Sequence, residues 1–130
     1  MTTSSKQLAP RILVAEDEEA IAEICQRVLA SEGFEVDVAG NGRVAQAMIC
    51  ERRYDLYLID IKMPVMGGRG LYKWMQEAYP RSADEVVFTT GSAENQDTES
   101  FLQRSGRPVL LKPFTPAQLK DVVKACLGKG

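Results

Sequence analysis

The segment Asp55-Leu56-Tyr57-Leu58-Ile59-Asp60 carries a nearly continuous apolar run that leads directly into a carboxylate. A short run of this kind is typical of a strand buried on both faces of a parallel sheet. Three other strand-like runs also lead into polar or charged residues: 11–15 before Glu16-Asp17, 85–89 before Thr90, and 108–111 before Lys112-Pro113. Ligands of open parallel α/β sheets bind beyond the carboxyl ends of the strands. The four runs therefore predict one polar site.

A fifth run, residues 34–38, alternates apolar and polar side chains, as expected of a half-exposed edge strand. Between the strands, apolar residues recur at helical spacing and predict five helices. The fourth helix has the weakest pattern, in the polar stretch 94–104. For the last helix, Thr115 is a plausible cap and Pro116 a plausible first residue. The apolar stripes are Ile21, Ile24, Cys25, Val28 and Leu29; Val44, Ala47, Met48 and Ile49; Leu71, Trp74 and Met75; Phe101 and Leu102; and Leu119, Val122, Val123 and Cys126.

Five β-α units predict an α/β fold with a doubly wound, five-stranded parallel sheet. The alternating second strand belongs at an edge, which the strand order 2-1-3-4-5 satisfies. This order places the switch point between the first and third strands, which end at Asp17 and Asp60. Residues 11–128 are expected to form one domain, and residues 1–10, rich in Thr and Ser, a disordered lead-in.

The composition excludes several classes of function. With 130 residues and a formal net charge of −2, the chain has no basic footprint for nucleic acid and no polybasic membrane anchor. No apolar run approaches a membrane span. Cys25, Cys50 and Cys126 are predicted to be reduced core thiols in a cytoplasmic chain. Histidine is absent, so any phosphohistidine must belong to a partner.

Considered one at a time, the residues at the strand ends have ordinary structural explanations. Asp17 can be the N-cap of the first helix, and Glu16 can be a solvated loop acid. Asp60 and Thr90 can be turn residues. Lys112 can lie on an exposed edge strand.

Considered together, the same residues favour phosphoryl-transfer chemistry. Glu16, Asp17 and Asp60 would repel one another at a single switch point unless a cation neutralised them. Oxygen ligands with open positions suit Mg²⁺. A carboxylate can attack phosphorus to form an acyl phosphate. Thr90 and Lys112 would then supply a hydroxyl donor and a cation for the transferred oxygens.

As an ordered set, these motifs resemble the receiver domain of two-component response regulators over essentially residues 11–127. The matching motifs are Glu16-Asp17, the segment 54–64, Thr90-Gly91 and Lys112-Pro113-Phe114. The resemblance implies a flavodoxin/CheY-like (βα)5 fold and the same strand order as the hydrophobic pattern.

The resemblance also implies a role for each acid. Asp60 would be the phosphoacceptor. Asp17, Asp60 and the backbone carbonyl of Lys62 would hold Mg²⁺, and Glu16 would act largely through a bound water.

For the phosphoryl group, the resemblance implies that Thr90 bonds it and that Lys112 pairs with it. The Lys112-Pro113 peptide bond is expected to be cis. Three residues before Lys112, where the family often has Tyr or Phe, this chain has Val109. The stretch 106–114 is similar to receivers attached to hybrid sensor kinases.

The function implied is that of a phosphoacceptor in a two-component phosphorelay, which switches conformation to regulate a downstream protein. Its donor would be a histidine kinase or a histidine phosphotransfer protein. Such a chain promotes only its own phosphorylation and dephosphorylation, and it is expected to be a monomer or a phosphorylation-dependent dimer. It can be a stand-alone regulator or the receiver module of a hybrid sensor kinase.

Two alternatives have weaker support. Phosphatases of the haloacid-dehalogenase type use an aspartyl nucleophile, but they carry a second Asp two residues later as general acid, where this chain has Lys62. A pseudo-receiver that has lost phosphorylation is disfavoured because all five functional positions are occupied.

Overall fold

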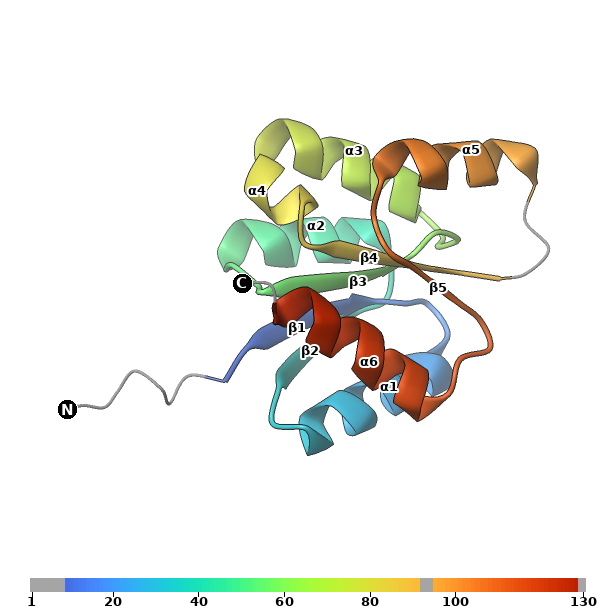
Figure 1. The fold of residues 1–130 in the computed structure, drawn as a ribbon. Coiled ribbons are helices and arrows are strands. Elements are labelled where there is room, and N and C mark those ends of the chain that lie inside the picture. The colour runs from blue at the N-terminus through green and yellow to red at the C-terminus, as the bar shows by residue number, and fades with distance from the viewer. Residues whose placement is uncertain (1–8, 92–94, 129–130) are drawn as a thin grey trace.

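A single parallel sheet of five strands forms the centre of the molecule, in the order β2-β1-β3-β4-β5 (Figure 1). The computed structural model describes residues 9–91 and 95–128. The predicted strand order is confirmed. The expected disordered lead-in at residues 1–10 lies almost entirely outside the described residues. The strands are β1 (Arg11–Ala15), β2 (Glu35–Ala39), β3 (Leu56–Asp60), β4 (Val86–Thr90) and β5 (Val109–Leu111).

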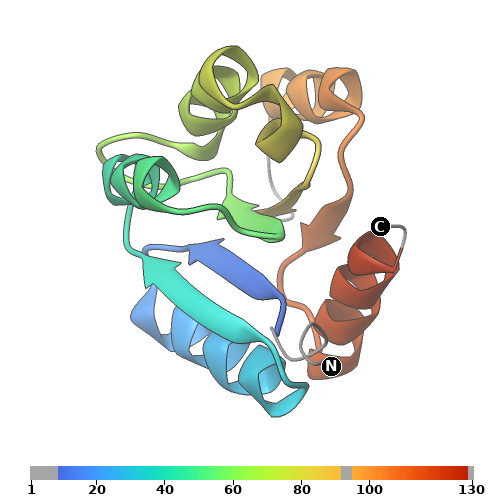
Figure 2. The same ribbon diagram turned by 90° about the vertical axis from the view of Figure 1, so that its left-hand side faces the viewer.

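Helices cover both faces of the sheet (Figures 1 and 2). One face carries two helices, and the other carries the remaining four. The helices are α1 (Glu19–Ser31) and α6 (Pro116–Leu127) on the first face, and α2 (Gly42–Glu51), α3 (Gly68–Ala78), α4 (Pro80–Ala83) and α5 (Gln96–Ser105) on the second. The short helix α4 was not predicted, because four residues are too few to show a helical period.

The core consists of two apolar layers, one on each face of the sheet. All five residues of β3 are buried, as its continuous apolar run predicted. By contrast, β2 is mostly half-exposed, which agrees with its edge position. The central strands β1, β3 and β4 are buried on both faces and pair in parallel. Their carboxyl ends therefore lie at the same edge of the sheet.

Three residues of the predicted helical stripes were assigned wrongly, because Ile24, Val44 and Ala47 are exposed. Ile24 and Val44 have 48% and 45% of their surface exposed. In α1 the neighbouring Ala22 and Cys25 are buried instead, and in α2 Ala45 is buried. Small alanines allow these helices to lie close to the sheet, so the larger neighbours are turned toward solvent. Of the three predicted core thiols, Cys25 is buried, Cys126 is half-buried and Cys50 is exposed.

Three local predictions near the end of the chain are confirmed. Thr115 is the N-cap of α6, with its hydroxyl accepting from the Gln118 amide at 3.1 Å, and the Gln118 side chain accepts in return from the Thr115 amide at 2.9 Å. Pro116 occupies the first helical position. The Lys112-Pro113 bond is cis.

Both ends of the described chain lie at the amino edge of the sheet, opposite the strand ends that carry the predicted site residues (Figure 1). The Arg11 amide donates to Asp55 at 2.8 Å, just before β3 begins. Cys126 and Leu127 line the same cavity as Asp55. Within residues 9–91 and 95–128, no helix is long and apolar enough to cross a bilayer.

The start of α3 is held against the end of β3 by a glycine. A Cβ on Gly68 would lie 2.6 Å from the backbone oxygen of Asp60 and 2.9 Å from the Cα of Ile61. The Gly68 amide donates to the Ile61 carbonyl at 2.9 Å. Only a glycine lets the helix begin this close to Asp60.

We therefore expect Gly68→Ala to lower the free energy of unfolding by about 1–3 kcal/mol, because the backbone of α3 must move away from β3. Gly70→Ala is the matched control. Its Cβ would meet only the Met66 side chain, at 3.5 Å, so the substitution should be neutral or stabilise by up to about 1 kcal/mol. Chemical denaturation measures both. Equal effects of the two substitutions would contradict the close approach at Gly68.

Candidate functional site

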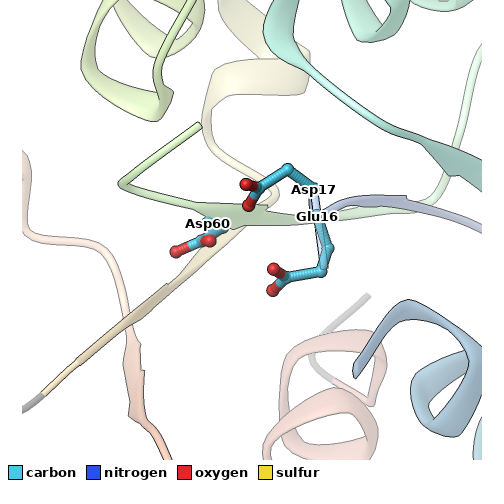
Figure 3. Close-up of side chains that lie close together, drawn as sticks. All are labelled: Glu16, Asp17 and Asp60. Carbon is cyan, nitrogen blue, oxygen red and sulfur yellow. The ribbon is translucent and has the colours of Figure 1, made fainter. Parts of the chain in front are cut away.

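Three carboxylates gather at the switch point between β1 and β3 (Figure 3). The two strands pair in parallel with Ala15 opposite Ile59, so the residues that follow them, Glu16 and Asp60, lie side by side. Asp17 follows Glu16. One oxygen from each of the three carboxylates lies within 4.8 Å of the other two. The predicted convergence of these acids is therefore present.

The three acids differ in burial. Glu16 and Asp60 each have only 4% of their surface exposed, whereas Asp17 is exposed. The interpretation of Glu16 as a solvated loop acid is wrong: its amide donates to the Ala39 carbonyl at 2.9 Å, which extends the β1–β2 ladder and keeps Glu16 within the sheet edge. Asp17 as N-cap is also wrong, because the N-cap of α1 is Glu18 and forms no side-chain cap bond.

Lys112 connects the two buried acids. Its Nζ lies 2.9 Å from Oε1 of Glu16 and 3.1 Å from Oδ2 of Asp60. The Lys112 side chain is only 17% exposed, so it is not the solvated edge lysine of the simpler explanation. Its amide donates to the Thr90 carbonyl at 2.8 Å, which fixes the base of the side chain beside the end of β4.

The electrostatics of the site follow from burial and crowding. Burial raises the pKa of Glu16 to about 7, with Asp60 adding to the rise and the hydrogen bond from Lys112 opposing it. Burial likewise raises the pKa of Asp60. For Lys112, burial would lower the pKa, but hydrogen bonds to both carboxylates outweigh burial and raise it. One ammonium thus contacts two of the three acids, and Asp17 is the third carboxylate of the cluster.

The donor set fits a small hard cation such as Mg²⁺. All three side chains present carboxylate oxygens, and Asp17 also lines an open cavity of about 510 Å³ together with Lys62 and the loop that follows β3. Mg²⁺ is usually held by one or two carboxylates and keeps open positions for water and phosphate oxygens. The Lys62 amide donates to Oδ1 of Asp60 at 3.4 Å, so this loop begins beside the Asp60 carboxylate.

Thr90 lies at the end of the neighbouring strand. It is 3% exposed, and β4 pairs with β3 such that Thr89 is opposite Asp60. The Thr90 hydroxyl makes one long contact, 3.4 Å to the Gly91 carbonyl. Glu16, Asp60 and Lys112 are in direct contact, and Thr90 lies at the adjacent strand end.

Sequence reasoning missed how the loop after Asp60 is held. Val65 has a positive φ of 68°, which a β-branched residue rarely adopts. The Gly42 amide at the start of α2 donates to the Met66 carbonyl at 2.9 Å, and a Cβ on Gly42 would collide with that carbonyl. In the sequence, only the glycine at position 42 could have indicated this close contact. The left-handed backbone of Val65 could not be predicted, because valine rarely adopts it.

Comparison with known proteins agrees with this geometry. The family model described as "Response regulator receiver domain" matches residues 12–124. The transcriptional regulatory protein DltR of Streptococcus agalactiae is 34% identical over 109 residues, or 84% of this chain and 48% of that protein. The DNA-binding response regulator MtrA of Mycobacterium tuberculosis is 32% identical over 117 residues, or 90% of this chain and 50% of that protein. The chain thus spans about half the length of these curated relatives.

Among solved structures, a CheY-like response regulator receiver domain protein from Methanospirillum hungatei aligns with a TM-score of 0.85 and 28% identity. The alignment covers 94% of this chain and 96% of the other. The solved chain therefore has nearly the same length as this one.

The bridging position of Lys112 generates a stability prediction. We expect Lys112→Met to lower the free energy of unfolding by about 1–3 kcal/mol without divalent ions, since it leaves two buried carboxylates without their shared cation. Lys124→Met removes a lysine that pairs with Glu32 at 2.6 Å on the surface, and it should change stability little, because exposed pairs contribute little. Urea denaturation at neutral pH measures both. A larger loss in Lys124→Met would contradict the structural role of Lys112.

Proposed function

Since the chain belongs to the response regulator receiver family of two-component systems, we propose that Asp60 accepts a phosphoryl group from the phosphohistidine of a partner. The observation that carries this proposal is the buried Asp60 carboxylate, held 3.1 Å from the ammonium of Lys112 at the switch point of the sheet. An oxygen of Asp60 attacks phosphorus as the bond to the imidazole nitrogen breaks. The electron pair stays on that nitrogen, and Asp60 becomes an acyl phosphate.

The neighbouring side chains would bind the transferred oxygens. Lys112 already lies within hydrogen-bond reach of Asp60, so its ammonium can pair with an oxygen of a phosphoryl group attached there. The Thr90 hydroxyl has only the long contact to Gly91 and can donate to another of these oxygens. Phosphoryl transfer needs little from the protein beyond such positioning and charge stabilisation.

Asp17, Asp60 and the backbone carbonyl of Lys62 would hold Mg²⁺, with Glu16 acting largely through a water molecule. When bound, the ion would neutralise the excess negative charge of the acids and of the incoming phosphoryl oxygens. Support comes from the three carboxylates within reach of one ion and from the open cavity beside Asp17.

The proposed partners are a histidine kinase or histidine phosphotransfer protein as donor and a downstream protein regulated by the conformational change, all in the cytoplasm. The curated relatives named above are described as a transcriptional regulatory protein and a DNA-binding response regulator. We propose that this chain supplies the receiver half of such a protein, acts alone, or serves as the receiver module of a hybrid sensor kinase. It binds no nucleic acid itself.

Turnover of external phosphate esters is not part of the proposed function. Lys62 stands where an aspartyl phosphatase would need a general acid, so the chain catalyses only its own phosphorylation and dephosphorylation. An assay with a generic phosphate ester would detect the alternative.

The first prediction of this function concerns the acceptor. With acetyl phosphate and Mg²⁺, the chain should gain the mass of one phosphoryl group, and Asp60→Asn should abolish the gain because an amide is not a nucleophile here. Asp55→Asn, at the opposite end of β3 and on the exposed surface, is the matched control and should be labelled normally. Labelling that survives Asp60→Asn would disprove the assignment.

The second prediction concerns the metal. We expect Asp17→Ala to weaken Mg²⁺ binding by about tenfold or more, because such sites depend on one or two carboxylates. Glu19→Ala, an exposed acid in the first turn of α1, should leave the affinity unchanged. Calorimetry is the suitable measurement, because it detects binding of the ion directly and needs no fluorescent residue near the acids. Equal affinities in the two variants would argue against Asp17 as a ligand.

A further inference from the structure

A groove of about 420 Å³ lies between α3 and α5, which run side by side on one face of the sheet (Figures 1 and 2). The Tyr72 and Phe101 rings meet edge to face beneath it, with centroids 5.9 Å apart. None of the residues that line it belongs to the acidic site. The groove is therefore a separate feature of the surface.

All the charged residues that line the groove are basic. Arg69 and Lys73 line it from α3 and Arg104 from α5, and the lining contains no Asp or Glu. All three cations are exposed, and within the part of the chain that the structure describes none of them forms an ion pair. Asp97 occupies the same side of α5 by helical spacing, but it does not line the groove. This concentration of positive charge contrasts with the net charge of −2 of the chain.

Arg69 is stacked on an aromatic ring at the edge of the groove. Its Cζ lies 5.0 Å from the centroid of the Phe101 ring, which itself packs against Phe88 at 5.5 Å. A guanidinium stacked on an aromatic face keeps its N–H edges free, and these edges match the two oxygens of a carboxylate. Since the ring already limits the motion of the side chain, binding costs less conformational entropy.

The cavity at the amino edge of the sheet has a different charge pattern from the groove. That cavity, of about 540 Å³, is lined by three arginines but also by three acids. One of the arginines, Arg53, is already paired with Glu85 at 3.2 Å. In the described part of the chain, the groove between α3 and α5 differs in that its lining holds three exposed cations, none of them in an ion pair, and no acid.

We propose that the groove docks an acidic segment of a partner protein, with carboxylates on Arg69, Lys73 and Arg104. A protein segment fits better than a nucleic acid for two reasons. Nucleic-acid sites without sequence preference combine a long basic track with open aromatic faces for stacking. Here Tyr72 is buried, Arg69 covers Phe101, and only three cations line the groove.

The test is a titration of the whole ¹⁵N-labelled chain with a short synthetic peptide in which glutamates alternate with leucines, followed by NMR chemical shifts. Shift changes should concentrate on α3 and α5 around Lys73 and Arg104. Because each exposed ion pair contributes a factor of a few, the triple variant Arg69→Gln, Lys73→Gln and Arg104→Gln should bind about tenfold or more weakly.

The matched control removes the same number of charges elsewhere, through Arg27→Gln, Arg43→Gln and Arg81→Gln, and should bind the peptide as the parent chain does. Circular dichroism verifies that both triple variants are folded. Arg69→Lys keeps the charge but loses the planar fork, and it should bind several-fold more weakly than the parent chain.

Three results would overturn the proposal. Shift changes centred on the acidic site or on another face would place the binding elsewhere. Equal binding of a peptide with glutamine in place of glutamate would show that charge is not recognised. Tighter binding of a single-stranded oligonucleotide of equal charge in the same groove would identify a nucleic-acid site instead. The test needs no phosphoryl donor, so its result is independent of the function proposed for Asp60.

Discussion

The parallel pairing of β1 with β3 at the centre of the sheet is the constraint on which the rest of the structure depends. Both strands are apolar and covered by helices on both faces, so their register is strongly specified. Glu16 follows β1 directly and Asp60 is the last residue of β3, so the register places the two acids side by side. The core thus forces like charges into contact, and the chemistry of the site is a consequence of that packing.

Keeping these charges together requires a cation from a distant part of the chain. Lys112 reaches the site because β5 lies beside β4, and its backbone is bonded to Thr90 before its side chain crosses toward the acids. A buried carboxylate that loses its partner is costly. Lys112 follows β5 and pairs with Glu16 after β1 and with Asp60 at the end of β3. Ion pairs therefore join these strand ends in addition to the backbone hydrogen bonds of the sheet.

The sheet order and the convergence of the strand ends could be predicted because apolar runs and alternation report burial directly. The orientation of Ile24 and Val44 could not, since a helical stripe does not show which of several apolar residues meets the sheet. The burial of Glu16 depends on a bond to the neighbouring strand, and the left-handed backbone at Val65 depends on contacts of the loop. Both are tertiary effects with no local signal.

The positions of the two chain ends explain how such a domain can be combined with others. β1 begins and α6 finishes at the amino edge of the sheet, whereas the acids, Thr90 and Lys112 occupy the carboxyl edge (Figure 1). Any polypeptide that continues from either end starts on the side opposite the acids. The attachment point of a fused domain would therefore lie away from the acidic edge and would not itself cover the carboxylates.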